Sequence, residues 1–261
     1  AESVATDISS LANVADESSV TLYKETVLAS SEKSAVVSDG KAYLVVTGLS
    51  SALPVGNEIT LVGVKGTDEE SNAAFVAYTS HTVTAETSSV TNPTPTYIGM
   101  AYYYVPAYTV VSGKLTQSGD SYTLTAPMGQ TIVIEAQASF GLASKVGSYV
   151  NAYGYVTDYV FPEGSEVETD TMILTAVSTV QFKENAAWTL SYSTDPEDPD
   201  YPEVITNTVS GSTVPYMLGI YTEEYYAKNV GTPESAALLM SDDLLYYLDL
   251  YSSSFSQEEL F

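Results

Sequence analysis

Two nine-residue segments of this chain match each other: Val55-Gly56-Asn57-Glu58-Ile59-Thr60-Leu61-Val62-Gly63 and Val146-Gly147-Ser148-Tyr149-Val150-Asn151-Ala152-Tyr153-Gly154. The valine and both glycines are identical, at a constant offset of 91 residues. Three identities in nine carry little weight alone. The match gains weight because the pattern of predicted strands around the two segments is also shared.

The same order of five predicted strands surrounds both segments. In the first copy, β-branched and aromatic residues between turn signals predict strands at 20–28, 34–38, 41–47, 58–64 and 74–84. In the second copy they predict strands at 110–114, 121–125, 131–136, 149–157 and 172–182. A short helix at 7–12, capped by Asp7 or by a serine, is predicted at the start of the first copy. Tandem copies of this size predict two domains rather than a solenoid.

The turns and glycines carry a resemblance to a known fold. Five short strands with Gly-x-x-Val/Ile-x-x-x-Gly opening the fourth resemble the OB-fold, a small Greek-key barrel. More specifically, Asp39-Gly40 and Gly56-Asn57-Glu58-Ile59 resemble OB-like domains in surface lipoproteins of gut bacteria. The second copy departs from this pattern, with the turn Pro127-Met128-Gly129 and with Ser148 in place of Asp or Asn. The resemblance covers residues 5–182.

The predicted fold class is mainly β: two tandem five-stranded OB-like Greek-key barrels, then a small α+β C-terminal unit. The boundaries are 5–87 for the first domain, 88–96 for a proline-containing linker, 97–185 for the second domain and 186–261 for the C-terminal unit.

The C-terminal unit combines strand and helix signals. Alternation in 188–192 and two further apolar runs at 203–209 and 215–221 predict strands. Caps at Thr232-Pro233-Glu234 and Ser241-Asp242-Asp243 predict helices. The unit resembles, more loosely, a C-terminal domain of the same lipoprotein group. Capping-box spacing at 254–257 and at 256–259 leaves two outcomes open: the last residues dock on the preceding helix, or the natural chain continues and the unit is incomplete.

The composition excludes several classes of function. The 261 residues contain 33 acidic and 8 basic side chains, for a net charge of −25, and all eight cations are lysine. A chain this acidic repels nucleic acid, and without arginine it has no bidentate group for phosphate. Without cysteine there are no disulfides, thiolate metal sites or cysteine nucleophiles. No apolar run reaches the length of a transmembrane helix.

The acidic, cysteine-free, β-rich composition predicts an exported protein. The lipoprotein resemblance implies a location at the cell surface or anchored to the outer membrane. The first residues, Ala1-Glu2-Ser3, lack the basic and apolar regions of a signal peptide. The lipoprotein resemblance implies a lipid-bearing cysteine upstream of Ala1, outside this chain.

A tyrosine-rich segment is the candidate ligand site. Tyr97, Tyr102, Tyr103, Tyr104 and Tyr108 lead into the second copy's first strand. OB barrels bind oligosaccharides or oligonucleotides across one face, and exposed aromatic rings serve as stacking surfaces. Since the charge disfavours nucleic acid, glycan or peptide remains as the ligand. The alternative interpretation is that these rings pack between the domains.

The other chemistry-bearing residues predict no catalytic or metal site. His81 is predicted to share a strand face with Phe75 and Thr79, while Ser80 points the other way, which disfavours a Ser–His pair. The acidic run at 195–203 lacks the spacing of a calcium loop. Sequence motifs for nucleotide, metal and acyl chemistry are absent, and no cofactor is expected.

The predicted function is therefore a non-catalytic binding or structural module. The alternative is a carboxylate-dependent hydrolase of glycans or peptides, which should show two carboxylates converging in a cleft, at least one with a raised pKa. Nucleic-acid binding, the third hypothesis, rests on fold analogy alone and is contradicted by the charge.

Overall fold

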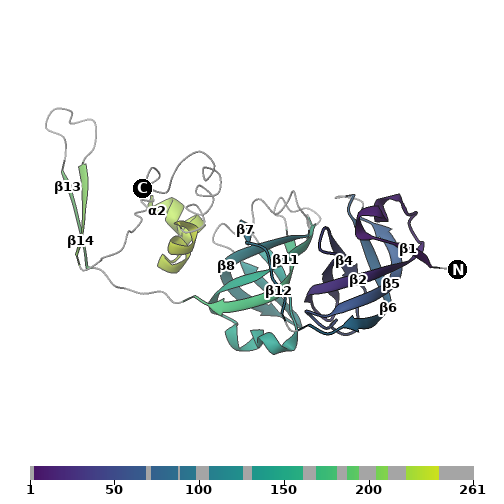
Figure 1. The fold of residues 1–261 in the computed structure, drawn as a ribbon. Helices are drawn as coiled ribbons and strands as arrows, with labels where there is room; N and C mark the ends of the chain where they lie inside the picture. The colour runs from purple at the N-terminus through teal and green to yellow at the C-terminus, as the bar shows by residue number, and fades with distance from the viewer. Residues whose placement is uncertain are drawn as a thin grey trace.

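The computed structural model describes residues 3–68, 72–87, 89–97, 106–125, 131–160, 169–180, 187–193, 204–210 and 222–240. The molecule is mainly β, as predicted, with a small helical region near the C-terminus (Figure 1). Two six-stranded sheets lie side by side, and a separate two-stranded hairpin follows them (Figure 1).

The first sheet contains β1 (Val4–Thr6), β2 (Ser19–Ser30), β3 (Ser34–Ser38), β4 (Tyr43–Thr47), β5 (Glu58–Thr67) and β6 (Ala74–Ala85). Its strand order is β1-β2-β3-β4-β6-β5, and β2 also pairs with β5. The five strands from β2 to β6 therefore form a closed ring. The 3₁₀ helix η1 (Ile8–Asn13) buries Leu11 in the core of this ring. Its predicted cap is confirmed, because Asp7 Oδ1 accepts a hydrogen bond from Ser10 N at 2.7 Å.

The second sheet contains β7 (Thr96–Tyr97), β8 (Ala107–Ser118), β9 (Ser121–Thr125), β10 (Thr131–Glu135), β11 (Tyr149–Val160) and β12 (Thr169–Thr179). Its order is β11-β12-β10-β9-β8-β7, and β11 also pairs with β8, which closes a five-stranded barrel. Each strand of the second sheet has a counterpart in the first sheet. The parallel pair β10–β12, for example, corresponds to the parallel pair β4–β6. The 3₁₀ helices η2 (Ala138–Phe140) and η3 (Leu142–Lys145) connect β10 to β11.

The first glycine of each matched segment makes the same turn. Gly56 and Gly147 have φ values of +90° and +86°, a region that favours glycine. Their N–H groups donate to the carbonyls of Val27 and Leu115, both at 2.8 Å. The carbonyl of the next residue in each copy accepts the N–H of that same valine or leucine, at 3.0 Å in both cases. The predicted equivalence of these two glycines is confirmed.

The second glycine of each segment permits close strand packing. Gly63 and Gly154 lie where the register of the antiparallel partner shifts, in β5 and β11. A Cβ on Gly63 would lie 2.4 Å from the carbonyl oxygen of Ala77, and one on Gly154 would lie 2.3 Å from that of Ile173. Only a residue without a side chain fits there, so the motif fixes a bulge in both copies.

Each barrel has its own apolar core, and a smaller third cluster joins them. This junction cluster contains Ala29 and Val36 of the first barrel with Tyr155 and Ile173 of the second, all at most 1% exposed. Consistent with this, β12 lies against β2 and β3. The barrels therefore share a buried contact rather than only a linker.

The C-terminal region begins with β13 (Ala187–Ser193) and β14 (Val204–Ser210), which pair antiparallel. A helical segment follows, with α2 (Glu223–Tyr225), the π-helix η4 (Tyr226–Val230) and a helix at 233–240. The predicted Thr232 cap is confirmed, since its Oγ1 accepts from Ser235 N at 3.1 Å. The predicted strand at 215–221, the acidic run at 195–203 and the helix from Ser241 onward lie outside the described residues. In the described part of the chain, no helix combines the length and apolarity needed to cross a bilayer.

Candidate ligand site between the barrels

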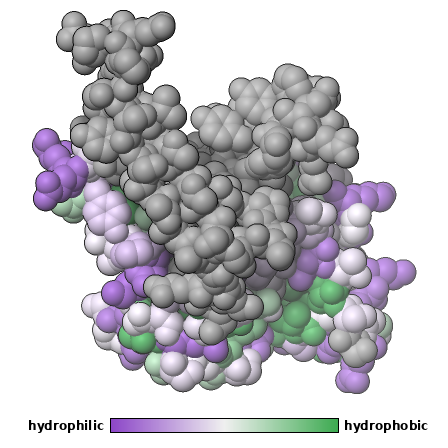
Figure 2. Space-filling view, turned by 90° about the vertical axis from the view of Figure 1, so that its left-hand side faces the viewer, coloured by the Kyte–Doolittle hydropathy of each residue, from purple (hydrophilic) through white to green (hydrophobic). Residues whose placement is uncertain are grey.

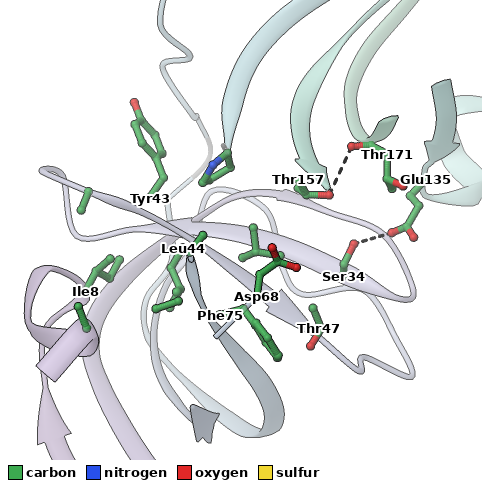
Figure 3. Close-up of a pocket in the computed structure, with 16 residues that line it drawn as sticks. Ile8, Ser34, Tyr43, Leu44, Thr47, Asp68, Phe75, Glu135, Thr157 and Thr171 are labelled. Atoms are coloured by element: carbon green, nitrogen blue, oxygen red, sulfur yellow. Dashed lines mark hydrogen bonds between the residues drawn. The ribbon is translucent and has the colours of Figure 1, made fainter. Parts of the chain in front are cut away.

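A cavity of about 540 Å³ opens where the two barrels meet, and we name it the junction cavity (Figure 3). The first barrel supplies its floor from the outer face of β3, β4 and β6. The second barrel supplies the opposite wall through Pro106, Glu135, Thr157 and Thr171. Binding sites for small ligands usually have volumes of about 300–1,000 Å³ and lie preferentially at domain interfaces.

The side chains of β4 alternate between the barrel core and the cavity, and the outward-facing ones form part of the cavity floor. Leu44 and Val46 are buried in the first barrel's core, so Tyr43, Val45 and Thr47 point outward into the cavity. Tyr43 is 41% exposed, which leaves a ring face available to a ligand.

Phe75, on the neighbouring strand β6, adds a second ring to the floor. It lies directly opposite Gly66 of β5, and its ring covers that glycine so closely that a Cβ there would lie 2.3 Å from Cζ. The ring position is thus fixed by the neighbouring backbone, and an aromatic face is held in place before any ligand arrives.

Glu135 fixes the opposite wall to the first barrel. Its Oε2 accepts hydrogen bonds from Ser31 Oγ at 2.7 Å and from Ser34 Oγ at 2.5 Å. Ser31 is only 2% exposed, and its Oγ also accepts from the N–H groups of Lys33 and Ser34. Hydrogen bonds to a charged acceptor are among the stronger polar contacts, so this group both joins the barrels and orients the carboxylate.

Asp68 brings a second carboxylate to the cavity from the first barrel (Figure 3). The connection from β5 to β6 positions it: Asp68 N donates to Ala73 O at 2.9 Å, and Asn72 N donates to Asp68 O at 3.0 Å. Asn72 takes a positive φ of +56° to close this turn. Carboxylates from both barrels therefore point into one space lined otherwise by hydroxyl groups, rings and aliphatic carbon.

Three tyrosines form a row beside the cavity. Tyr155 lies between Tyr43 and Tyr108, with ring centroids 5.9 Å and 5.0 Å away. It is 1% exposed, and its hydroxyl donates to Asn92 Oδ1 at 3.3 Å. Burial raises the pKa of the Tyr155 phenol, and the neighbouring phenols of Tyr43 and Tyr108 add to this. Tyr155 is thus a neutral structural ring of the junction.

The structure describes only some of the tyrosines of the predicted ligand site. Tyr108 is half-buried against Tyr155, and its hydroxyl is 3.2 Å from Thr175 Oγ1, so it packs at the junction. Tyr97 lies in β7, and Tyr102, Tyr103 and Tyr104 lie outside the described residues. Their role in ligand binding stays a prediction.

His81 corrects one expectation from strand alternation. Val62 pairs with Ser80 but Gly63 pairs with Tyr78, so Thr79 is an extra residue in β6. This bulge reverses the alternation and places His81 on the face of Tyr78 rather than that of Phe75 and Thr79. The Tyr78 hydroxyl is 2.9 Å from His81 Nδ1.

A carboxyl group with a raised pKa exists in this chain, but it lies elsewhere. Burial raises the pKa of Glu25 to about 7, and the charges of Asp39 and Asp7 contribute. Glu25 is 1% exposed and does not line the junction cavity. Within the described ranges, no group of three or more His, Cys, Asp or Glu side chains could hold a metal ion.

No sequence pattern singled out the four side chains that supply the rings and carboxylates of the cavity: Tyr43, Phe75, Asp68 and Glu135. Alternation in 43–47 could have identified Tyr43 as outward-facing. The wall from the second barrel has no signal in the sequence, because it depends on how two separately folded barrels dock. Comparison with known proteins adds no relative: no family model and no curated protein matches this chain.

Proposed function

We propose that this protein is a non-catalytic glycan-binding module, built from two tandem OB-like barrels, of an exported cell-surface lipoprotein. The matched strand order of the two sheets supports the OB-like assignment, since an OB-fold is a five-stranded Greek-key barrel. The acidic, cysteine-free composition and the resemblance of 5–182 support export and anchoring upstream of Ala1.

The junction cavity is the observation that carries the binding proposal. Its floor is the outer face of the second and third barrel strands of the first copy, the face through which OB-folds bind oligosaccharides and oligonucleotides. Tyr43 and Phe75 offer ring faces to the C–H side of a sugar. Asp68, Glu135 and Thr47 offer acceptors for sugar hydroxyls. A net charge of −25 disfavours an oligonucleotide in the same place.

A hydrolase is the second candidate, because Asp68 and Glu135 enter one cavity from opposite barrels. Glycoside hydrolysis needs one carboxyl group that stays protonated to donate to the leaving oxygen. Glu135 Oε2 already accepts hydrogen bonds from two serine hydroxyls of the first barrel, so this carboxyl group serves to join the barrels. This arrangement fits binding better than acid catalysis, and assay of the bound glycan for cleavage separates the two functions.

The test is an array of glycans and peptides probed with the intact chain, followed by titration of the tightest glycan. Tyr43→Ala should weaken that glycan's binding about tenfold or more, on the scale of about 1–3 kcal/mol measured for stacking of one base on one ring. Tyr23→Ala is the matched control, because Tyr23 is a 57%-exposed tyrosine of the same barrel that does not line the cavity.

Equal affinity of the wild type and Tyr43→Ala would contradict the proposed site. Binding confined to peptides would contradict the glycan assignment. Release of shortened glycan by the wild type, abolished in Glu135→Gln, would favour the hydrolase instead.

A further inference from the structure

The charge of the junction cavity restricts which glycans it can hold. Of the described residues that line it, the charged ones are Asp68 and Glu135, and both are acids. An anionic sugar would face two like charges in a partly enclosed space, where repulsion is stronger than in bulk water. Uronic acids and sulfated or phosphorylated sugars are therefore disfavoured.

The Glu135 carboxylate is held in an orientation that suits the binding of a cation. Both serine hydroxyls donate to Oε2, and Oε1 receives no hydrogen bond from any residue the structure describes. The serines hold the group in one orientation, so little side-chain freedom is lost when a ligand binds. A hydrogen bond from an ammonium group to such an oxygen is stronger than one from a neutral hydroxyl.

Rings complete the environment of an ammonium group on a sugar. A cation is attracted to the face of Tyr or Phe at short range, and Tyr43 and Phe75 supply such faces on the floor. The same rings accept the C–H face of a pyranose, and Thr47 and Thr157 supply hydroxyls to its remaining polar groups. A ligand that combines a polyol ring with a protonated amine uses every element of this lining.

We infer that the junction cavity selects glycans containing amino sugars with a free amine, whose ammonium group binds between Asp68 and Glu135. This inference rests on the proposed function and adds the chemical class of the glycan. The field of a molecule with 33 acids and 8 lysines attracts the same ligands from solution. Hydrophilic residues project along both sides of the face shown in Figure 2, with hydrophobic residues between them along its lower part.

The test compares two tetrasaccharides of identical linkage, one of β1→4-linked glucosamine and one of β1→4-linked N-acetylglucosamine. Both are titrated into the intact chain at low ionic strength and slightly acid pH. We expect the glucosamine tetramer to bind about tenfold more tightly, the difference that one charge-assisted hydrogen bond supplies. The preference should shrink as salt is added.

Variants of the two lining acids test whether the preference for the glucosamine tetramer arises in the junction cavity. Asp68→Asn and Glu135→Gln should each weaken binding of the glucosamine tetramer more than binding of the acetylated tetramer, and so reduce the ratio of the two affinities toward one. Asp120→Asn is the control, because it removes the same charge from an exposed turn between β8 and β9, outside the cavity. It should leave the ratio unchanged.

The outcomes separate this inference from the proposed function. Equal or tighter binding of the acetylated tetramer overturns the amino-sugar inference and leaves glycan binding standing. If no glycan on the array and neither tetramer binds, the proposed function fails as well. Tetralysine is the third ligand in this test. If it binds as tightly as the glucosamine tetramer, the cavity recognises the ammonium group without the sugar, and the inference is wrong.

Discussion

Glu25 is the residue whose position conflicts most with its chemistry. It faces the interior of the first barrel between Leu22 and Val27, because Tyr23 and Lys24 form a bulge in β2 and Lys24 takes a φ of +64°. Its Oε2 is buried and has no hydrogen-bond partner among the residues that the structure describes. A charged carboxylate is costly in such a place, so the pKa of Glu25 rises from 4.5 to about 7.

This raised pKa predicts that stability falls as pH rises. Below pH 4.5 the carboxyl is protonated in both the folded and unfolded chains and imposes no penalty. Between pH 4.5 and 7 the unfolded chain releases its proton while the folded chain keeps it, so unfolding becomes easier. Above pH 7 the loss is complete, on the order of 3 kcal/mol.

Glu25→Gln should therefore raise the free energy of unfolding by about 3 kcal/mol above neutral pH and by much less in acid. Urea unfolding of the intact chain on both sides of this range measures the effect. The exposed Glu86→Gln should change stability little at either pH. A Glu25→Gln variant with an unchanged pH profile would contradict the assigned burial penalty.

At the scale of elements, the repeated glycine pair explains why both barrels share one strand order. Gly56 and Gly147 redirect the chain into β5 and β11, and Gly63 and Gly154 accommodate the bulges of the partner strands β6 and β12. The two glycines of each copy have different constraints, since one needs a positive φ and the other needs the absence of a Cβ.

Substitution by alanine should separate these constraints. In Gly154→Ala the new Cβ meets the backbone oxygen of Ile173 at 2.3 Å, which cannot rotate away, so we expect a loss of about 3 kcal/mol in unfolding free energy. Gly147→Ala meets nothing within 4 Å and should lose only the strain of a positive φ, about 1–2 kcal/mol. Denaturant unfolding of both variants gives the comparison, and equal losses would refute the bulge argument.

Much of the strand pattern could be predicted from the sequence because it depends on local chemistry. The predicted strands at 34–38 and 121–125 match β3 and β9 residue for residue. Asp39 makes the predicted turn, with Oδ1 accepting from Lys41 N and Ala42 N. Alternation failed where a bulge inserts a residue, as at Thr79, because the partner strand determines that shift.

At the scale of the whole molecule, the junction could not be predicted because its contacts join residues about a hundred positions apart. Ser31 and Ser34 donate hydrogen bonds to Glu135, and the tilted rings of Tyr43 and Tyr155 lie 5.9 Å apart. No local pattern distinguishes these side chains from other surface hydroxyls, acids and rings. The candidate site lies at this junction, so sequence reasoning placed the ligand face on the tyrosine run instead.

The double variant Ser31→Ala/Ser34→Ala should loosen the junction while leaving both barrels folded. It removes both hydroxyl donors to Glu135 Oε2, and one lost hydrogen bond of about 1 kcal/mol speeds local opening several-fold. Hydrogen exchange at β3 and β10 should accelerate, whereas exchange in β9 should not. Unchanged exchange at β3 would show that the apolar cluster alone holds the barrels together.

The central claim is that a glycan binds between the two barrels, in contact with both. Hydrogen exchange of the intact chain, with and without the tightest-binding glycan from the array, tests it most directly. We predict simultaneous slowing at β4 and the start of β6 in the first barrel and at the end of β10 in the second. Slowing confined to one barrel, or located away from the junction cavity, would contradict the claim.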